Sequence, residues 1–359
     1  MNPTSATFIT PTPRPFRLAP GPSTLHRAPR IVALGGGTGL PTLLRGLKQT
    51  MFHRLANCAS MRERLTAVVT MADDGGSSGR LREAYGVLPP GDLRNCLLAL
   101  SDGNPRLASL FAYRFGGGGE LGGHNLGNLI LTALSQMEQD LLRAIEWAGE
   151  ALDVRGRVLP ASLEPITLGA AYEDGGLIEG ESRIASAGRR IEHVFLRPSR
   201  VRALPEAARA ILDADMIVIA PGSLYTSILP ILLIREIAEA IALSTAPVAL
   251  VLNLMAEPGE TDGFTASDFV LAIRKHAPQV RVSDVLVNSV PIPSRQIARY
   301  AQQGAGAVRI DAEALRFLGC SLVERDLLEP GSKVRHDPLK LARTVMELVE
   351  EETQWAITT

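Results

Sequence analysis

The feature of this sequence that most constrains its fold is a repeated order of elements: a short apolar run, a polar loop and then a helical pattern. Five runs rich in β-branched residues are expected to be strands, namely Arg30–Leu34, Thr66–Thr70, Met216–Ala220, Val248–Asn253 and Val285–Val287. This order is typical of βαβ units, and it predicts an α/β fold with a doubly wound, mostly parallel, Rossmann-like sheet. In such sheets ligands bind beyond the carboxyl ends of the strands, near the point where the strand order reverses. We therefore expect the polar loops to meet in one crevice.

A different pattern interrupts this order in the middle of the chain. Ile166–Tyr172 and Leu177–Glu181 are extended runs on either side of Glu173-Asp174-Gly175-Gly176, which predicts a β-hairpin. With Val158–Leu159 and Ile191–Leu196 it is expected to form a small β-rich insertion at about residues 154–196. The insertion belongs to a single α/β domain that spans residues 30–351.

The two ends of the chain are expected to differ from this domain. Residues 1–29 contain seven prolines, seven Ser or Thr residues and no acidic residue, which predicts a disordered Pro-rich tail. The tail lacks the apolar segment of a secretory signal, and its prolines oppose the helix of a transit peptide. The alternative to a translated, disordered tail is a misassigned start codon. At the other end, Asp337 to Glu351 has the spacing of a surface helix that closes the domain, and residues 352–359 are expected to be flexible.

Composition excludes several classes of protein. The chain has 359 residues, of which 46% are hydrophobic and 21% charged, enough to bury a large core. A formal net charge of -1 supports neither nucleic-acid binding nor attraction to an acidic membrane. Three distant cysteines, without a CxxC pair, indicate a reducing compartment and hence a cytoplasmic protein without a thiolate zinc site. The longest apolar stretch, Met216 to Ile234, contains prolines and a glycine and is a poor membrane span.

The first candidate site is a glycine-rich loop directly after the first strand. Gly35-Gly36-Gly37-Thr38-Gly39 precedes a helical face of leucines. Glycines let the backbone approach an anion, and the free N–H groups of the helix start can bind phosphate. We therefore assign Gly36, Gly37, Thr38 and Gly39 to ligand binding; the alternative is a tight turn that needs positive φ.

The second candidate loop follows the second strand. Its expected ligand contacts are Asp73, Asp74, Gly75, Gly76, Ser77, Ser78, Arg80 and Arg82. The two carboxylates could accept ribose hydroxyls, act as a base, or hold Mg²⁺ if the protein is a transferase. A helix-capping turn would explain one Asp or Ser of this set.

Two further helix starts carry polar residues. Asp92, Arg94 and Asn95 open one helix, where an arginine opposes the helix dipole unless an anion is also bound. His124, Asn125 and Asn128 open another, after the flexible run Gly116 to Gly119, which we interpret as a lid. Asp92 as a plain N-cap and His124 as an ordinary helix-entry residue are the alternatives. The histidines have no paired ligand spacing, so we expect no metal site among them.

The last candidates lie in the second half of the chain. A buried run ends in the Pro221 to Ser227 loop, before a helix expected to run through Ile241 with Pro230 in its first turn. The loop after the next strand offers polar side chains that can accept hydrogen bonds from a sugar or base, and an aromatic ring that can stack on a base. The residues assigned to ligand binding here are Gly222, Ser223, Tyr225, Thr226, Ser227, Asn253, Glu260, Thr261, Asp262 and Phe264. Thr226 or Ser227 as a cap and Phe264 as core are the alternatives.

Taken together, these motifs resemble the CofD/YvcK family, and specifically its YvcK branch of gluconeogenesis factors. GGGTGL, DDGGSSGRLR, PPGDLRNC, GHNLGN, APGSLYTSILP, PGETDGF and the late Arg335-His336-Asp337 stand in the family's order between Arg30 and about Val349. The resemblance implies a CofD-like fold that binds UDP-sugars such as UDP-N-acetylglucosamine or UDP-glucose. It also implies a role in cell shape and in control of cell-wall precursors during gluconeogenic growth.

Two functions of different classes follow from this resemblance. The first is a regulatory UDP-sugar sensor without catalysis, acting through a protein partner that the sequence does not identify; a homo-oligomer is compatible with it. The second is a Mg²⁺-dependent 2-phospho-L-lactate-type transferase related to CofD, in which Asp73 and Asp74 hold the metal. A nicotinamide-dependent enzyme is disfavoured, because no GxGxxG with a ribose-binding acid follows the first strand. Beyond that Mg²⁺ the sequence implies no cofactor, and it identifies no catalytic residue.

Overall fold

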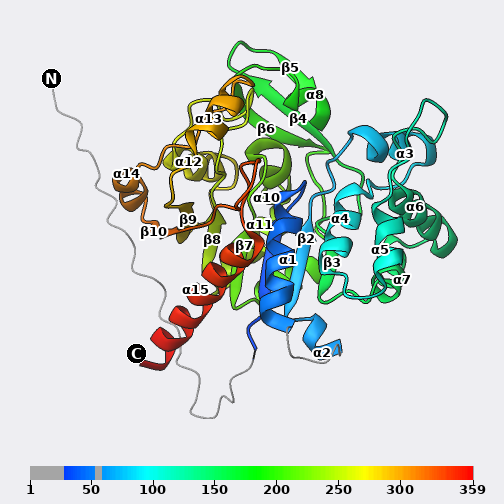
Figure 1. The fold of residues 1–359 in the computed structure, drawn as a ribbon, viewed down its shortest axis with the longest axis horizontal. Helices are drawn as coiled ribbons and strands as arrows, with labels where there is room; N and C mark the ends of the chain where they lie inside the picture. The colour runs from blue at the N-terminus through cyan, green and yellow to red at the C-terminus, as the bar shows by residue number, and fades with distance from the viewer. Residues whose placement is uncertain (1–27, 53–58, 359) are drawn as a thin grey trace.

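The core of the protein is one seven-stranded parallel sheet. The computed structural model describes residues 28–52 and 59–358, so residues 1–27 of the predicted tail lie outside the described residues. The strand order is β10-β9-β8-β7-β1-β2-β3, and every pairing in it is parallel (Figure 1). The strands are β1 (Ile31–Gly35), β2 (Leu65–Val69), β3 (Arg157–Pro160), β7 (Met216–Ile219), β8 (Val248–Val251), β9 (Asp284–Asn288) and β10 (Ser321–Arg325). The predicted parallel α/β sheet is confirmed.

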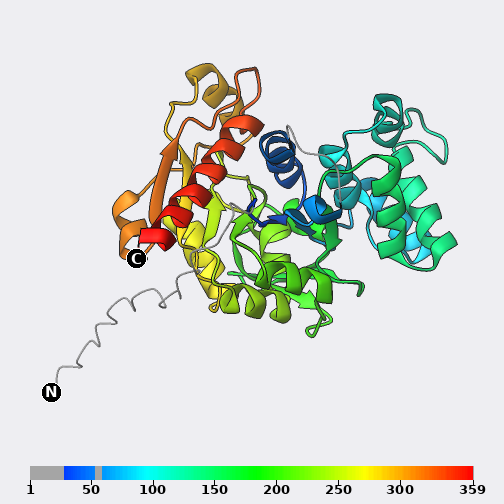
Figure 2. The same cartoon turned by 90° about the horizontal axis from the view of Figure 1, so that it is seen from below.

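Helices cover both faces of this sheet, as expected for strands that are apolar on both sides. Every residue of β1, β2, β7 and β8 is buried. Figures 1 and 2 show α1 and α15 on one face and the helices that follow β7 and β8 on the other. The first face carries α1 (Gly39–Phe52), α4 (Gly91–Leu100) and α15 (Pro338–Thr358), and the second carries α9 (Pro205–Leu212), α11 (Arg235–Leu243) and α12 (Ala266–His276). The sheet is therefore doubly wound.

Helix α15 packs directly on α1. A Cβ added to Gly46 would lie 1.8 Å from the carbonyl oxygen of Pro338, so the two helix backbones touch at this point. The apolar spacing of this segment predicted a helix ending at Glu351, whereas α15 continues to Thr358. Residues 352–358, expected to be flexible, lie in that last part of the helix, and their side chains are outside the described set.

The strand order reverses between β1 and β7. From β1 the chain moves outward through β2 to β3, and it returns to the other side of β1 with β7 before moving outward through β8, β9 and β10. The loops after β1 and β7 therefore lie side by side at the carboxyl edge. This is the position where open parallel sheets bind ligands.

A group of helices follows β2 and precedes β3 in the sequence, and it extends to one side of the sheet (Figure 2). Its members, besides α4, are α3 (Gly76–Tyr85), α5 (Pro105–Ala112), α6 (Leu126–Glu138) and α7 (Leu141–Ala151). The shorter helices elsewhere are α2 (Ala59–Arg62), α13 (Ser294–Ala301) and α14 (Ala312–Phe317). No helix in residues 28–52 or 59–358 has the length and apolar character needed to cross a bilayer.

The predicted hairpin exists, but the insertion is smaller than expected. β4 (Thr167–Tyr172) pairs antiparallel with β5 (Leu177–Glu179) and with β6 (Ile191–Arg197), and α8 (Glu181–Ala185) follows β5. The assignment of Val158–Leu159 to this insertion was wrong, because these residues lie in β3 and pair parallel with β2. A short apolar run does not show which sheet it joins.

The segment after β7 also differs from the prediction of a single helix through Ile241. It consists of a π-helical turn, η1 (Leu224–Ile228), then α10 (Leu229–Leu232), and then α11 from Arg235. Ile234 between α10 and α11 has extended backbone angles, with φ -73° and ψ 107°. Pro230 starts α10 because proline lacks the N–H that a helix interior requires.

Candidate functional site

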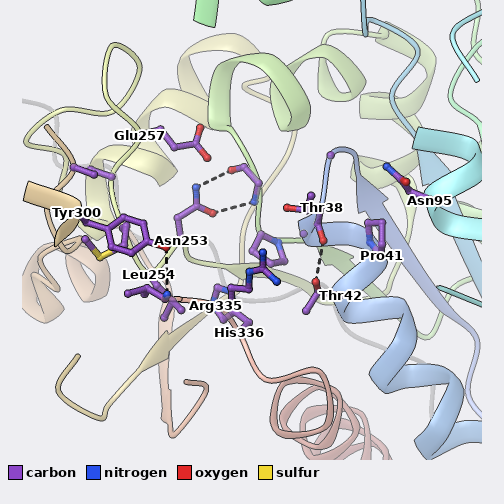
Figure 3. Close-up of a pocket in the computed structure, with 18 of the residues that line it drawn as sticks. Thr38, Pro41, Thr42, Asn95, Asn253, Leu254, Glu257, Tyr300, Arg335 and His336 are labelled. Carbon is purple, nitrogen blue, oxygen red and sulfur yellow. Dashed lines mark hydrogen bonds between the residues drawn. The ribbon is translucent and has the colours of Figure 1, made fainter. Parts of the chain in front are cut away.

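A cavity of about 600 Å³ lies at the strand-order reversal, where the loops after β1, β7 and β8 meet. We call it the switch-point cavity. Part of its wall consists of residues that the sequence assigned to ligand binding: Gly37, Thr38, Gly39, Asn95, Gly222 and Asn253. Figure 3 shows its polar wall. Its volume is within the range of small-molecule sites in proteins.

The glycine loop after β1 forms one wall. Gly37 has φ +59°, a conformation that other residues rarely adopt, and Gly39 begins α1. A Cβ on Gly39 would lie 1.6 Å from the carbonyl oxygen of Pro221, so the loops after β1 and β7 touch through their backbones. The first turn of α1 contains no acidic residue. The positive end of a 14-residue helix therefore faces the cavity, which favours an anion there.

The loop after β7 is held in place by Asn253, which follows β8. The Asn253 side chain accepts a hydrogen bond from Gly222 N at 3.0 Å and donates one to Gly222 O at 2.9 Å (Figure 3). Both polar atoms of this amide are thus used by the protein. Asn253, predicted to contact ligand, thus positions the loop that contains Gly222.

The cavity lining also contains residues that the sequence did not assign to the site. Arg45 of α1 and Arg335 are exposed at the cavity, and no ion pair within 4.0 Å is recorded for either among residues 28–52 and 59–358. Tyr300 of α13 lines the cavity as well, and its hydroxyl accepts a hydrogen bond from Val334 N at 3.3 Å. Arg335 belongs to a motif noted in the sequence, but Arg45 and Tyr300 carry no local signal.

Asp92 lies beside the glycine loop, in the first turn of α4. Its carboxylate accepts a hydrogen bond from Gly37 N at 2.9 Å. Burial, opposed by this hydrogen bond and reinforced by the charge of Asp73, raises the pKa of Asp92 to about 6. Asp92 thus accepts the hydrogen bond of a backbone N–H group of the glycine loop, and its charge depends on pH near neutrality. A Cβ on Gly36 would lie 2.6 Å from the same carboxylate, which explains the glycine there.

Several predicted ligand contacts instead form a buried polar network that joins α3, α4 and α6. Arg94 donates to Asn128 and to Asn95, each at 2.6 Å, and Asn128 donates to the Ser77 hydroxyl at 3.1 Å. Ser77 also lies 3.1 Å from His124 Nδ1. Burial first, and then the charge of Arg80, lower the pKa of His124. Within this set, only Asn95 lines the switch-point cavity.

Two more residues of that region have structural contacts. Asn125 is the N-cap of α6, since its side chain accepts hydrogen bonds from the backbone N–H groups of Gly127 and Asn128. Ser78 is buried, and a Cβ on Gly91 would lie 2.4 Å from its hydroxyl oxygen. These contacts fix the helix starts around the glycine loop.

The Asp73–Arg82 loop borders a second hollow, of about 570 Å³. Predicted residues in its lining are Asp74, Gly76, Arg80 and Arg82. Both oxygens of Asp74 accept backbone hydrogen bonds from α8, from Glu181 N at 3.0 Å and Ser182 N at 2.9 Å. Asp73 accepts one from Gly75 N at 2.9 Å.

These contacts bear on the Mg²⁺ site that was predicted for Asp73 and Asp74. Asp74 uses one acceptor position on each of its oxygens to cap α8, so a cation bound by Asp73 and Asp74 would share this carboxylate with the start of α8. Within residues 28–52 and 59–358, no group of three or more His, Cys, Asp or Glu side chains is arranged to hold a metal ion. We derive no chemical step from a metal at this position.

The residues around η1 surround buried carboxyl groups. Thr226 donates to Glu260 Oε1 at 3.2 Å, while Glu260 Oε2 is buried with no hydrogen-bond partner. Burial, and next the charge of Glu257, raise the pKa of Glu260 to about 8. Burial, and then the charges of Asp73, Asp74 and Asp92, raise the pKa of Glu181 to about 7.

The remaining predicted residues of this region pack within the protein. Phe264, predicted to stack on a ligand, makes edge contacts with Tyr225 and Phe269, with ring centroids 6.3 and 5.8 Å away. Thr261 accepts from Glu257 N at 2.9 Å, and Asp262 from Gly259 N at 2.6 Å. Ser223, Tyr225, Thr226, Ser227, Glu260, Thr261, Asp262 and Phe264 are not part of the cavity lining.

The fold and the cavity define an α/β protein with a glycine-lined cavity at the reversal of its strand order. A family model described as 2-phospho-L-lactate transferase CofD matches residues 31–328. The chain therefore belongs to the CofD family.

Individual relatives place the chain in the branch of the gluconeogenesis factors. A protein of Listeria monocytogenes named gluconeogenesis factor is 42% identical over 90% of this chain and 97% of its own length. The protein of the same name from Bacillus subtilis is 43% identical over 91% of this chain and 100% of its own length. A crystal structure of a protein from Bacillus halodurans is 44% identical and has a TM-score of 0.83, over 89% of this chain and 100% of that one.

Proposed function

We propose that this protein binds a UDP-sugar, UDP-N-acetylglucosamine or UDP-glucose, in the switch-point cavity. The observation that carries this proposal is the presence of a helix start and two arginines in the lining of one cavity. The open start of α1, Arg45 about two turns further along the same helix, and Arg335 all line it, and no ion pair is recorded for either arginine within the described residues. Such an arrangement fits the two negative charges of a diphosphate.

The ends of the cavity suit the groups on either side of a diphosphate. In Figure 3, Tyr300 lies on one side of Asn253, and Thr38 and Asn95 lie on the other. The Tyr300 ring offers a face for stacking a base. The Thr38 and Asn95 end offers polar groups to the sugar that follows the second phosphate.

The biological role that we propose follows from the relatives. Proteins named gluconeogenesis factor match nearly the whole chain. We propose a cytoplasmic regulator that senses the UDP-sugar and controls cell shape and cell-wall precursors during gluconeogenic growth, by way of a protein partner. The ligand would be bound and released without chemical change.

Calorimetric titration with UDP-N-acetylglucosamine, UDP-glucose, UDP and GDP, each with and without Mg²⁺, tests this proposal. We expect saturable binding of the UDP-sugars, with the ligand recovered intact by chromatography. Absence of binding at millimolar ligand would refute it.

A transferase related to CofD is the second candidate, because the matching family model carries that description. The test is product formation from a guanylyl-lactyl donor and a deazaflavin acceptor in the presence of Mg²⁺, with Asp74→Asn as the comparison. Turnover that the variant abolishes would favour the transferase. Recovery of both substrates unchanged would leave the sensor as the function.

A further inference from the structure

Glu257 is an acidic residue in the wall of a cavity whose other charged groups are cations. The residue is half-buried and lines the switch-point cavity together with Arg45 and Arg335. No ion pair is recorded for Glu257 in the described part of the chain, and its pKa is raised above the usual value, first by burial. The Ser223 side chain lies near the carboxylate and opposes this shift in pKa. An ionised carboxylate has about four acceptor positions, so most of them are open to a ligand.

A carboxylate can only accept hydrogen bonds, so it selects donors and repels phosphate. The phosphates of a bound nucleotide are therefore directed away from Glu257 and toward the start of α1. The donor groups that a nucleotide carries next to its diphosphate are the hydroxyls of the ribose. Uracil contributes a single N–H donor and otherwise presents acceptors.

The position of Glu257 agrees with a contact to the ribose. Its neighbour Ser223 directly follows Gly222. A Cβ on Gly222 would lie 3.9 Å from the carbonyl oxygen of Gly36 in the glycine loop, where we place the phosphates. Glu257 therefore lies beside the loop that adjoins the proposed phosphate site. Figure 3 shows Glu257 above Asn253, between Tyr300, which we assign to the base, on the left and Thr38 of the glycine loop on the right. A group beside both the base and the diphosphate is the ribose.

We infer that Glu257 recognises the ribose hydroxyls of the nucleotide and makes the cavity selective for ribonucleotides over deoxyribonucleotides. The inference rests on the proposed function, because it assumes that a nucleoside diphosphate occupies the cavity. It adds a specificity-determining residue to that function.

The experiment compares the binding of UDP and 2′-deoxy-UDP to the full chain by calorimetry. We expect wild-type protein to bind UDP about ten- to a hundred-fold more tightly, since the deoxy ligand leaves a carboxylate without its donor. Glu257→Ala should weaken UDP binding and bring the two affinities within about threefold. Glu257→Gln, which keeps one acceptor oxygen, should retain part of the preference.

The controls separate the possible failures. Glu313→Ala, at an exposed position of α14 outside the cavity lining, should behave as wild type, and a thermal melt of each variant establishes that it is folded. Equal binding of UDP and 2′-deoxy-UDP by wild-type protein would overturn the inference while leaving the proposed function intact. An unchanged preference in Glu257→Ala would overturn it as well. If neither nucleotide binds, the proposed function fails and this inference with it.

UDP-N-acetylglucosamine serves as a third ligand. If Glu257→Ala weakens the binding of this ligand and leaves the binding of UDP unchanged, the contact is to the hexose and the ribose assignment is wrong.

Discussion

Gly39 and Pro221 touch through their backbones, and this contact joins the two halves of the sheet at the ligand cavity. A Cβ on Gly39 would lie 1.6 Å from the carbonyl oxygen of Pro221 and 2.5 Å from its carbonyl carbon. Neither atom belongs to a side chain that can rotate away. The glycine at position 39 is thus required by the approach of the two loops, whatever its role toward a ligand.

We predict that Gly39→Ala destabilises the protein by at least about 3 kcal/mol, because one of the two loops must move. Urea unfolding followed by circular dichroism measures the change. Gly119→Ala is the control, since nothing lies within 4 Å of a Cβ there, and it should stay within about 0.5 kcal/mol of wild type. Wild-type stability of Gly39→Ala would show that this backbone contact is not present in solution.

We predict that Arg45→Ala and Arg335→Ala each weaken binding of UDP-N-acetylglucosamine about tenfold, because each removes a cation from the cavity. The thermal midpoint should stay unchanged, since both side chains are exposed. Salt should weaken binding less steeply in the variants than in wild type. Arg235→Ala, whose arginine pairs with Glu239 on α11, is the matched control. Equal affinity of all four proteins would remove the basis for a diphosphate in this cavity.

We predict that ligand binding weakens as pH rises from 5 to 7.5. The pKa of Asp92 is about 6, so its carboxyl group is neutral at the lower pH and negatively charged beside the glycine loop at the higher one. The probe is UDP-N-acetylglucosamine without Mg²⁺, because its phosphates stay ionised over this range. Asp92→Asn keeps an acceptor for Gly37 N and should bind more tightly at pH 7.5, with little dependence on pH. A wild-type affinity that is flat with pH would contradict this role of Asp92.

We predict that Glu260 lowers the stability of the protein at alkaline pH. Its pKa in the folded protein is about 8, against 4.5 for an unperturbed glutamate, so folding favours the protonated form. The associated stability is complete below pH 4.5 and is lost as pH rises through 8, an effect on the order of several kcal/mol. Glu260→Gln cannot ionise, so its thermal midpoint should fall less than that of wild type between pH 5 and 8.5. Glu313→Gln, at an exposed position, is the control and should show the same dependence of the thermal midpoint on pH as wild type. If Glu260→Gln also shows the wild-type dependence, the prediction is wrong.

The sequence predicted the parts of the fold that depend on local signals. Apolar β-branched runs identified β1, β2, β7, β8 and β9 of the parallel sheet, and glycines identified the loops after β1 and β7. The edge strand β10 was not predicted, because it is largely exposed and contains charged residues. Its errors concern long-range pairing: nothing in Val158–Leu159 shows that this run pairs with β2 rather than with the hairpin.

The same limit applies to the site. The glycines around the cavity were predicted because a phosphate-binding loop has a local pattern. Asp74 was assigned to the ligand, yet it caps a helix 107 residues further along the chain, and no local pattern indicates such a partner. Arg45 and Tyr300 look like ordinary surface residues of helices, and only the tertiary structure brings them to the cavity.

The contact between α15 and α1 has a consequence for the synthesis of this protein. Residues 39–46 of α1 are among the first to emerge from the ribosome, whereas Pro338, which touches Gly46, emerges near the end of translation. Until then the helix that begins at the glycine loop lacks one of its packing partners. Nascent chains that have not reached α15 therefore should not form a complete glycine-loop site.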